Sequence, residues 1–262
     1  MVSSTAISAM VATLLLALLF PVALAVWFYL RERYAPSALV VGVAMMTLSQ
    51  FVIRIPLLQR AALSAWFKAL ASNTLAYALF LGLTAGIFEE VARYVGFRFF
   101  LKNRLEWKNG IAYGLGHGGI EAILLVGVAY INNLVFSFMI NSGTFDSRVA
   151  PSLAPGLAQY VKASLTSTAP FMFLLAGIER VLALTIQVAL SLVVLYSLTA
   201  KRPVYLLYAI LLHALVDTPA VILAKYVRNP LVIEAYVLLL AAIGLAFILR
   251  SRRVFKSETP ES

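Results

Sequence analysis

Cysteine is absent from this chain of 262 residues. Its absence excludes disulfide bonds, a thiolate nucleophile and metal sites with cysteine ligands. Charge is also scarce, since only 12% of the residues are Asp, Glu, Lys or Arg, whereas about 25% is usual in a soluble domain. The composition therefore argues against a soluble globular protein.

Apolar residues supply 62% of the chain and gather in long runs. About 20 apolar residues span a bilayer, and seven such runs fit with little linker between them. We therefore predict an all-α fold, a polytopic membrane helix bundle of about seven transmembrane helices. Residues 1–249 would form a single transmembrane domain and residues 250–262 a flexible cytoplasmic tail. The first run exceeds the roughly 7 to 15 residues of a signal-peptide core, so we predict a retained helix.

Short polar or proline-containing segments separate the predicted spans. The spans cover about residues 5–30, 37–53, 73–101, 109–140, 168–200, 203–226 and 230–249. Residues 54–72 mix basic residues with Leu57 and Trp66, which is typical either of an interfacial segment or of an external loop. Residues 141–167 form the longest polar interval and are predicted to be a loop that contains a short surface helix.

The positive charge of the chain follows the spans. A net charge of +10 would suggest nucleic acid in a soluble protein, but here Lys and Arg lie between apolar runs. With seven spans, 12 of them fall on one side and seven on the other, Arg54 among the seven. Because the cytoplasmic side carries the excess, we predict a multi-pass cell-membrane protein with its N-terminus outside and its C-terminus in the cytoplasm.

Three ionisable residues lie within five positions of the third predicted span: Glu89, Glu90 and Arg93. Charges at membrane depth cost roughly 2.5 to 3.5 kcal/mol on insertion scales and mark functional sites by default. Helical spacing of three or four residues lets Arg93 pair with either carboxylate. Two adjacent carboxyls in a low dielectric resist joint ionisation, so one is expected to hold a proton. The arginine would leave the other carboxylate free for chemistry.

Both histidines of the chain lie inside predicted spans, each with a carboxylate one helical turn later. The two pairs are His117 with Glu121 and His213 with Asp217. The fifth span adds Glu179, Arg180 and Gln187 as supporting residues. Adjacent helical residues point about 100° apart, so Glu179 and Arg180 are each expected to meet a different neighbour. We predict that these polar residues converge on one cavity, because pairing within each helix cannot satisfy them all.

Each of these pairs also has a structural interpretation. The carboxylates with Arg93 could form a buried ion pair, and each histidine pair could be hydrogen-bonding glue between helices. The conjunction favours chemistry, since carboxylates and histidines at one depth supply a general base, a general acid and an electrophilic donor.

Four motifs resemble the intramembrane glutamic protease superfamily, which includes the CAAX prenyl endopeptidases, the Abi proteins and PrsW. They are Glu89-Glu90-Val91-Ala92-Arg93, Gly116-His117-Gly118-Gly119-Ile120-Glu121, Glu179-Arg180 and His213-Ala214-Leu215-Val216-Asp217. The pattern is most similar to the YhfC branch of membrane peptidases. CAAX endopeptidases carry EExxxR and FxxxH, whereas this chain has EExxR and Tyr113 four residues before His117, so prenyl-protein specificity is not supported.

The resemblance implies an intramembrane endopeptidase with a catalytic core at about residues 73–226. Glu89 or Glu90 would activate water, and His117 or His213 would polarise the scissile carbonyl or stabilise the oxyanion. Asp217 would orient His213, and Arg93 would tune the acidic pair. The implied partners are membrane lipid and a peptide or membrane-protein substrate, with no nucleic acid and no cofactor.

Two alternatives remain open from the sequence. A zinc-dependent peptidase would take its ligands from His117, Glu121, His213 and Asp217, whose nitrogen and oxygen atoms zinc accepts. A proton-coupled transporter or channel would use the same carboxylates and histidines as a proton relay. Transporters often show internal repeats, and none is visible here.

Overall fold

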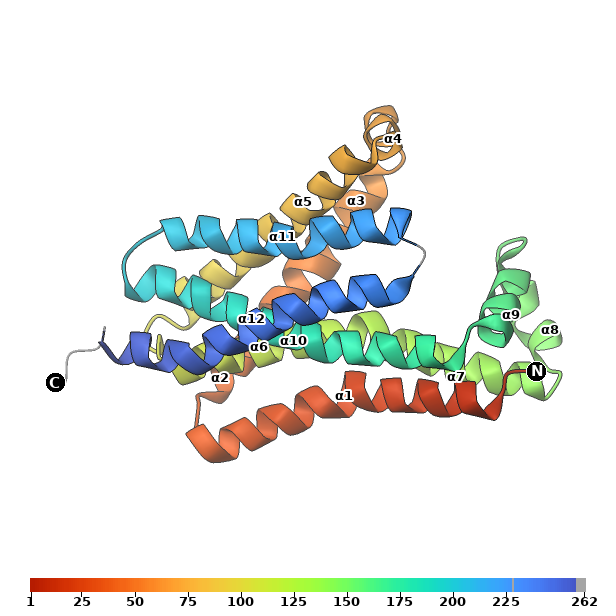
Figure 1. Cartoon of the computed structure of the whole chain (residues 1–262), viewed down its shortest axis with the longest axis horizontal. Coiled ribbons are helices and arrows are strands. Elements are labelled where there is room, and N and C mark those ends of the chain that lie inside the picture. Colours follow the sequence, from red (N-terminus) through yellow and green to blue (C-terminus); the bar gives the residue numbers. More distant parts are fainter. Residues whose placement is uncertain (228, 258–262) are drawn as a thin grey trace. The chain divides into compact units, whose positions relative to one another are not determined.

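The computed structural model describes residues 1–227 and 229–257. Within this part of the chain every regular element is helical and no strand occurs, as the all-α prediction requires (Figure 1). Seven helical segments are long and apolar enough to cross a membrane, which confirms the predicted number. They are Ser4–Glu32, Pro36–Ala61, Thr74–Phe100, Trp107–Asn141, Pro170–Thr199, Val204–Tyr226 and Pro230–Phe255.

Three of these segments contain a stretch of π-helix. The elements in chain order are α1 (Ser4–Glu32), α2 (Pro36–Met46), η1 (Thr47–Arg54), α3 (Ile55–Ala61), α4 (Ala65–Ser72), α5 (Thr74–Val95), η2 (Gly96–Phe100), α6 (Trp107–Ala122), η3 (Ile123–Gly127), α7 (Val128–Asn141), α8 (Phe145–Arg148), η4 (Ala150–Ser152), α9 (Leu157–Ser167), α10 (Pro170–Thr199), α11 (Val204–Tyr226) and α12 (Pro230–Ser257). π-Helical turns are rare and frequently mark functional sites. Here η1 contains Gln50 and Arg54, η2 begins three residues after Arg93, and η3 begins two residues after Glu121.

Span boundaries differ from the prediction at two places. The second span continues through η1 and α3 to Ala61, so Arg54 lies inside a span and not in a polar connection. Helix α12 continues to Ser257, whereas a flexible tail was predicted from residue 250; residues 258–262 lie outside the described residues. The predicted surface helix in the long polar interval is α9.

The segment after Arg54 is helical and amphipathic. Helix α4 begins at a side-chain cap, since Ser64 Oγ accepts from the Phe67 amide, and α5 begins in the same way at Asn73. Such caps satisfy amides that a helix start leaves without partners. Leu57 and Trp66 are exposed, and Leu57 lies inside the second membrane-crossing segment.

The chain divides into two compact units. Unit 1 comprises Met1–Val22 and Ala122–Val181. Its core contains Met10, Tyr130 and Phe173. The Phe173 carbonyl accepts hydrogen bonds from Thr13 Oγ1 at 2.6 Å and from the Tyr130 hydroxyl at 2.9 Å. Two side chains on different helices thus converge on one carbonyl of α10.

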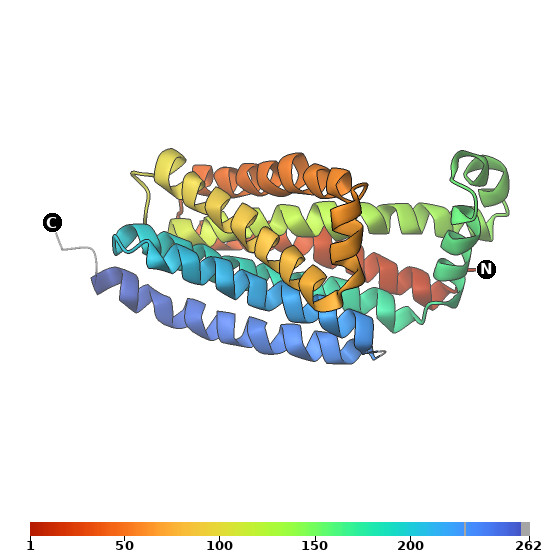
Figure 2. The same cartoon turned by 90° about the horizontal axis from the view of Figure 1, so that it is seen from above.

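Unit 2 comprises Ala23–Glu121 and Leu182–Ser262, of which the structure describes all but residues 228 and 258–262. Within it α11 packs against α5 (Figures 1 and 2). Helices α2 and α6 approach closely through two glycines. A Cβ on Gly116 would lie 2.1 Å from the Leu39 carbonyl oxygen, and one on Gly42 would lie 2.2 Å from the Tyr113 carbonyl oxygen. Small residues let helix backbones approach closely, and here they bring the backbone of His117 against α2.

Candidate active site

Glu89 lies at the centre of a buried polar cluster in unit 2. Its Oε2 lies 2.9 Å from His117 Nε2 and accepts a hydrogen bond from Gln187 Nε2 at 3.2 Å. Its Oε1 accepts from Gln50 Nε2 at 2.6 Å. Glu89 thus contacts His117 and Gln187 directly, each from a different helix, as the predicted convergence requires.

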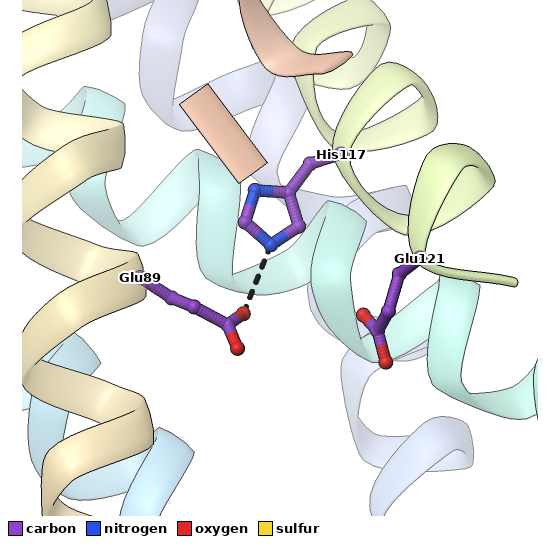
Figure 3. Close-up of side chains that lie close together, drawn as sticks. All are labelled: Glu89, His117 and Glu121. Atoms are coloured by element: carbon purple, nitrogen blue, oxygen red, sulfur yellow. Dashed lines mark hydrogen bonds and ion pairs between the residues drawn. The ribbon is translucent and has the colours of Figure 1, made fainter. Parts of the chain in front are cut away.

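Glu121 completes a compact set of donor atoms with Glu89 and His117. Figure 3 shows the Glu89 side chain entering from α5 and the other two from α6, all directed into the same space. One donor atom from each residue lies within 4.8 Å of the other two. Gln187 Nε2 donates to Glu121 at 2.9 Å as well as to Glu89. A single amide group thus bridges the two carboxylates.

Glu90 faces away from this set and supports a histidine. Its Oε1 lies 2.7 Å from His213 Nδ1, and its Oε2 lies 3.2 Å from Arg93 Nε. The side chains of Glu90 and Arg93 are both 0% exposed, so neither charge is compensated by water. The expectation that Arg93 engages one carboxylate and leaves the other free is met, with Glu90 as the engaged one.

Arg93 uses the rest of its guanidinium to fix α10. It donates to the Gln187 backbone carbonyl at 2.7 Å, to Ser191 Oγ at 2.6 Å and to Gln187 Oε1 at 2.7 Å. Because a guanidinium only donates, Gln187 must turn its amide nitrogen toward the carboxylates. Arg93 therefore orients Gln187 in addition to pairing with Glu90.

His213 is held by Glu90 more closely than by Asp217. Its Nε2 lies 3.7 Å from Asp217 and 3.8 Å from Glu89 Oε2. The Glu90 carboxylate is fully buried, whereas the Asp217 side chain is 38% exposed. The shorter, buried contact comes from Glu90, because α11 packs against α5; the orienting role of Asp217 stays a prediction.

Glu179 and Arg180 belong to unit 1. Arg180 Nη2 donates to Glu179 Oε1. The long arginine side chain folds back onto Glu179, and the expectation that each residue also meets a different neighbour stays a prediction.

Two residues of the cluster were missed by the sequence analysis. Gln50 is 4% exposed and contacts Glu89 directly. Arg54 had been assigned to the polar connection, but its Nη1 donates to Gln50 Oε1 at 3.1 Å. An amide inside an apolar span was the available signal for Gln50. Nothing in the spacing of Arg54 distinguished it from an interfacial arginine.

The contacts of His117 form the structural test of whether these residues fit a metal. Its Nε2 lies between a pure donor, Arg93 Nη2 at 3.2 Å, and the Glu89 carboxylate oxygen at 2.9 Å. One ring nitrogen cannot both accept from the first and donate to the second. A cation between Nε2 and the Glu89 oxygen would use the Nε2 lone pair in place of a shared proton, so Arg93 could no longer donate to that nitrogen. Nitrogen and carboxylate oxygen are the donors that zinc takes. The residues therefore fit a divalent metal.

Comparison with known proteins agrees with this chemistry. The model of the family described as "YhfC intramembrane metalloprotease" matches residues 15–237. The uncharacterized membrane protein YhfC of Bacillus subtilis (strain 168) is 36% identical over 263 residues, which cover 98% of this chain and 100% of that protein. No solved structure matches the chain. With a family match over most of its length and a full-length relative, the chain belongs to the YhfC intramembrane metalloprotease family.

Proposed function

We propose that this protein is an intramembrane peptidase that hydrolyses peptide bonds of membrane-embedded substrates with a zinc ion held by Glu89, His117 and Glu121. The observation that carries the proposal is the grouping of their three donor atoms within 4.8 Å of one another, with Glu89 and His117 buried and Glu121 partly buried. Such an ion, when bound, supplies Lewis-acid activation of water and of the scissile carbonyl. The expectation of no cofactor is not supported, since the family is described as a metalloprotease.

The ligand set differs from the one considered for zinc on the sequence. That set took His213 and Asp217 along with His117 and Glu121. Glu89 replaces the first two here, because its carboxylate lies beside His117 whereas His213 Nδ1 is engaged by Glu90.

His213 is proposed to carry the proton of the reaction. Glu90 holds Nδ1, so the proton stays on that atom and Nε2 presents its lone pair toward Glu89. During hydrolysis the water oxygen bonds to the carbonyl carbon and the peptide C–N bond breaks. Nε2 takes the proton released by the water and returns it to the departing amine. A partly exposed Asp217 at 3.7 Å steadies the protonated ring.

A metal-free mechanism is the second candidate, favoured by the 2.9 Å contact between Glu89 and His117. In it Glu89 takes the proton of the water directly, as in the superfamily that the motifs resemble. The two candidates share Glu89 and differ in their dependence on a metal.

Metal removal separates the candidates. We expect the purified protein to contain zinc and to cleave members of a library of membrane-segment peptides, to lose both properties with a chelator, and to regain them with added zinc. Metal content is measured by mass spectrometry and cleavage by peptide analysis. Cleavage that persists in the metal-free protein would select the glutamate mechanism. No cleavage under any condition, together with ion flux in liposomes, would replace both by transport.

We also propose that the C-terminus lies in the cytoplasm and the N-terminus outside. The support is the excess of basic residues that the sequence places on one side, 12 against seven. Because the chain has no cysteine, a single introduced thiol reports one position. We expect an impermeant maleimide to label Ser152→Cys on intact cells and Asn103→Cys only after permeabilisation; the opposite pattern would invert the orientation.

A further inference from the structure

Two arginine–glutamine pairs hold the Glu89 carboxylate, one on each oxygen. Gln50 Nε2 donates to Oε1 at 2.6 Å and Gln187 Nε2 donates to Oε2 at 3.2 Å. Gln50 comes from η1 and Gln187 from α10. The carboxylate is therefore hydrogen-bonded on both oxygens by residues of two elements far apart in the sequence.

Each glutamine is oriented by an arginine behind it. A side-chain amide has a donor end and an acceptor end, and its neighbours decide which end faces which way. Arg54 Nη1 donates to Gln50 Oε1 at 3.1 Å, and Arg93 Nη2 donates to Gln187 Oε1 at 2.7 Å. Since a guanidinium cannot accept a hydrogen bond, both amide nitrogens must face Glu89.

Arg54 is itself anchored to the helix that carries Glu89. Its Nη2 donates to the Leu81 carbonyl at 2.8 Å and to Thr84 Oγ1 at 3.2 Å, and its Nε donates to Thr84 Oγ1 at 3.3 Å. Leu81 and Thr84 precede Glu89 on α5. The arginine thus spans from α5 to η1 and fixes where Gln50 meets the carboxylate.

We propose that Gln50 and Arg54 are positioning residues of the active site, with Arg54 acting through Gln50. Gln50 occupies Oε1 of Glu89 and thereby aims Oε2 at His117 and His213. Both residues lie before the catalytic core that the sequence motifs defined at about residue 73. The inference rests on the proposed function in that it takes Glu89 to be a group of the reaction site.

A double-mutant cycle tests whether Arg54 acts on Glu89 through Gln50, an arrangement called the Arg54–Gln50 relay below. Groups that orient metal ligands typically contribute 10–100-fold to metal affinity or activity. Gln50→Met, which keeps the length and removes the amide, is expected to lower zinc affinity and kcat/KM by about that factor. Arg54→Met is expected to do the same alone and to add less than about threefold in the Gln50→Met background, because residues that act through one contact are not additive.

Matched controls lie further along the same span, where Gln59 and Arg60 of α3 are exposed. Gln59→Met and Arg60→Met are expected to leave zinc affinity and kcat/KM unchanged. Arg54→Lys is expected to recover part of the loss, since an ammonium can still donate to Gln50 Oε1. Wild-type behaviour of Gln50→Met, or fully multiplicative effects of the two substitutions, would overturn the relay.

Thermal unfolding provides the measurement that does not depend on catalysis. If wild type neither binds zinc nor cleaves peptide, the proposed function fails while the relay is still tested by Tm. The Tm decrease caused by Gln50→Met should then disappear in a Glu89→Leu background, because the hydrogen bond it removes is already lost. An undiminished decrease in that background would refute the contact that carries the proposal.

Discussion

Replacing His117 by alanine is expected to lower peptide cleavage by about 10³-fold, the effect of removing a group that acts at the reacting atoms, and to abolish zinc binding. The reason is that His117 supplies the only nitrogen in the compact donor set with Glu89 and Glu121 among the described residues. Zinc bound by two carboxylates alone loses the ligand type that best distinguishes it from harder cations. Metal content and kcat/KM of the purified variant check this expectation.

His213→Ala is the matched control, since it removes the other histidine of the chain. Its Nδ1 is engaged by Glu90 at 2.7 Å, and it is proposed to carry a proton and not to hold the metal. We expect this variant to keep its zinc while losing cleavage. Zinc retained by His117→Ala and lost by His213→Ala would exchange the roles assigned to the two histidines.

Replacing Arg93 by methionine is expected to destabilise the protein by about 3–5 kcal/mol, the usual cost of removing one partner of a buried ion pair. The Glu90 carboxylate would be left at 0% exposure without its arginine. Gln187 and Ser191 would also lose donors. Methionine keeps the length of the side chain, so the loss is electrostatic more than steric. Reversible unfolding in detergent measures the difference.

Arg98→Met is the control for this substitution, because Arg98 is exposed at the end of the same span. It should change stability by less than about 0.5 kcal/mol, as surface substitutions usually do. Adding Glu90→Gln to Arg93→Met should recover part of the loss, since it removes the unpaired buried charge. Equal stabilities of Arg93→Met and Arg98→Met would contradict the buried pair.

Much of the site could be predicted because charge inside an apolar span is conspicuous. Glu89, His117 and Glu121 were each visible in the sequence for this reason, and the structure groups them. Gln50 and Arg54 were missed. An uncharged amide hardly alters hydropathy, and an arginine near the end of a span has the same appearance whether it faces headgroups or a buried glutamine.

The sequence could not specify which carboxylate pairs with which histidine or arginine. A spacing of one helical turn predicted that Asp217 pairs with His213, whereas the shorter contact to His213 comes from Glu90 on another helix. The same spacing offered either Glu89 or Glu90 to Arg93, and the structure selects Glu90. Such selections depend on how α5, α10 and α11 are rotated about their axes, which no periodicity in a single segment specifies.

The sequence by itself determined that this chain is all-helical, with seven apolar spans among the described residues, and it showed which spans contain charged residues. Both properties are local, since a bilayer requires each segment to satisfy its own backbone and penalises each buried charge separately. The tertiary structure alone decided which oxygen of Glu89 faces His117 and which glutamines hold it. Those choices arise from close helix contacts, such as that of Gly116 with Leu39, between residues distant in the chain.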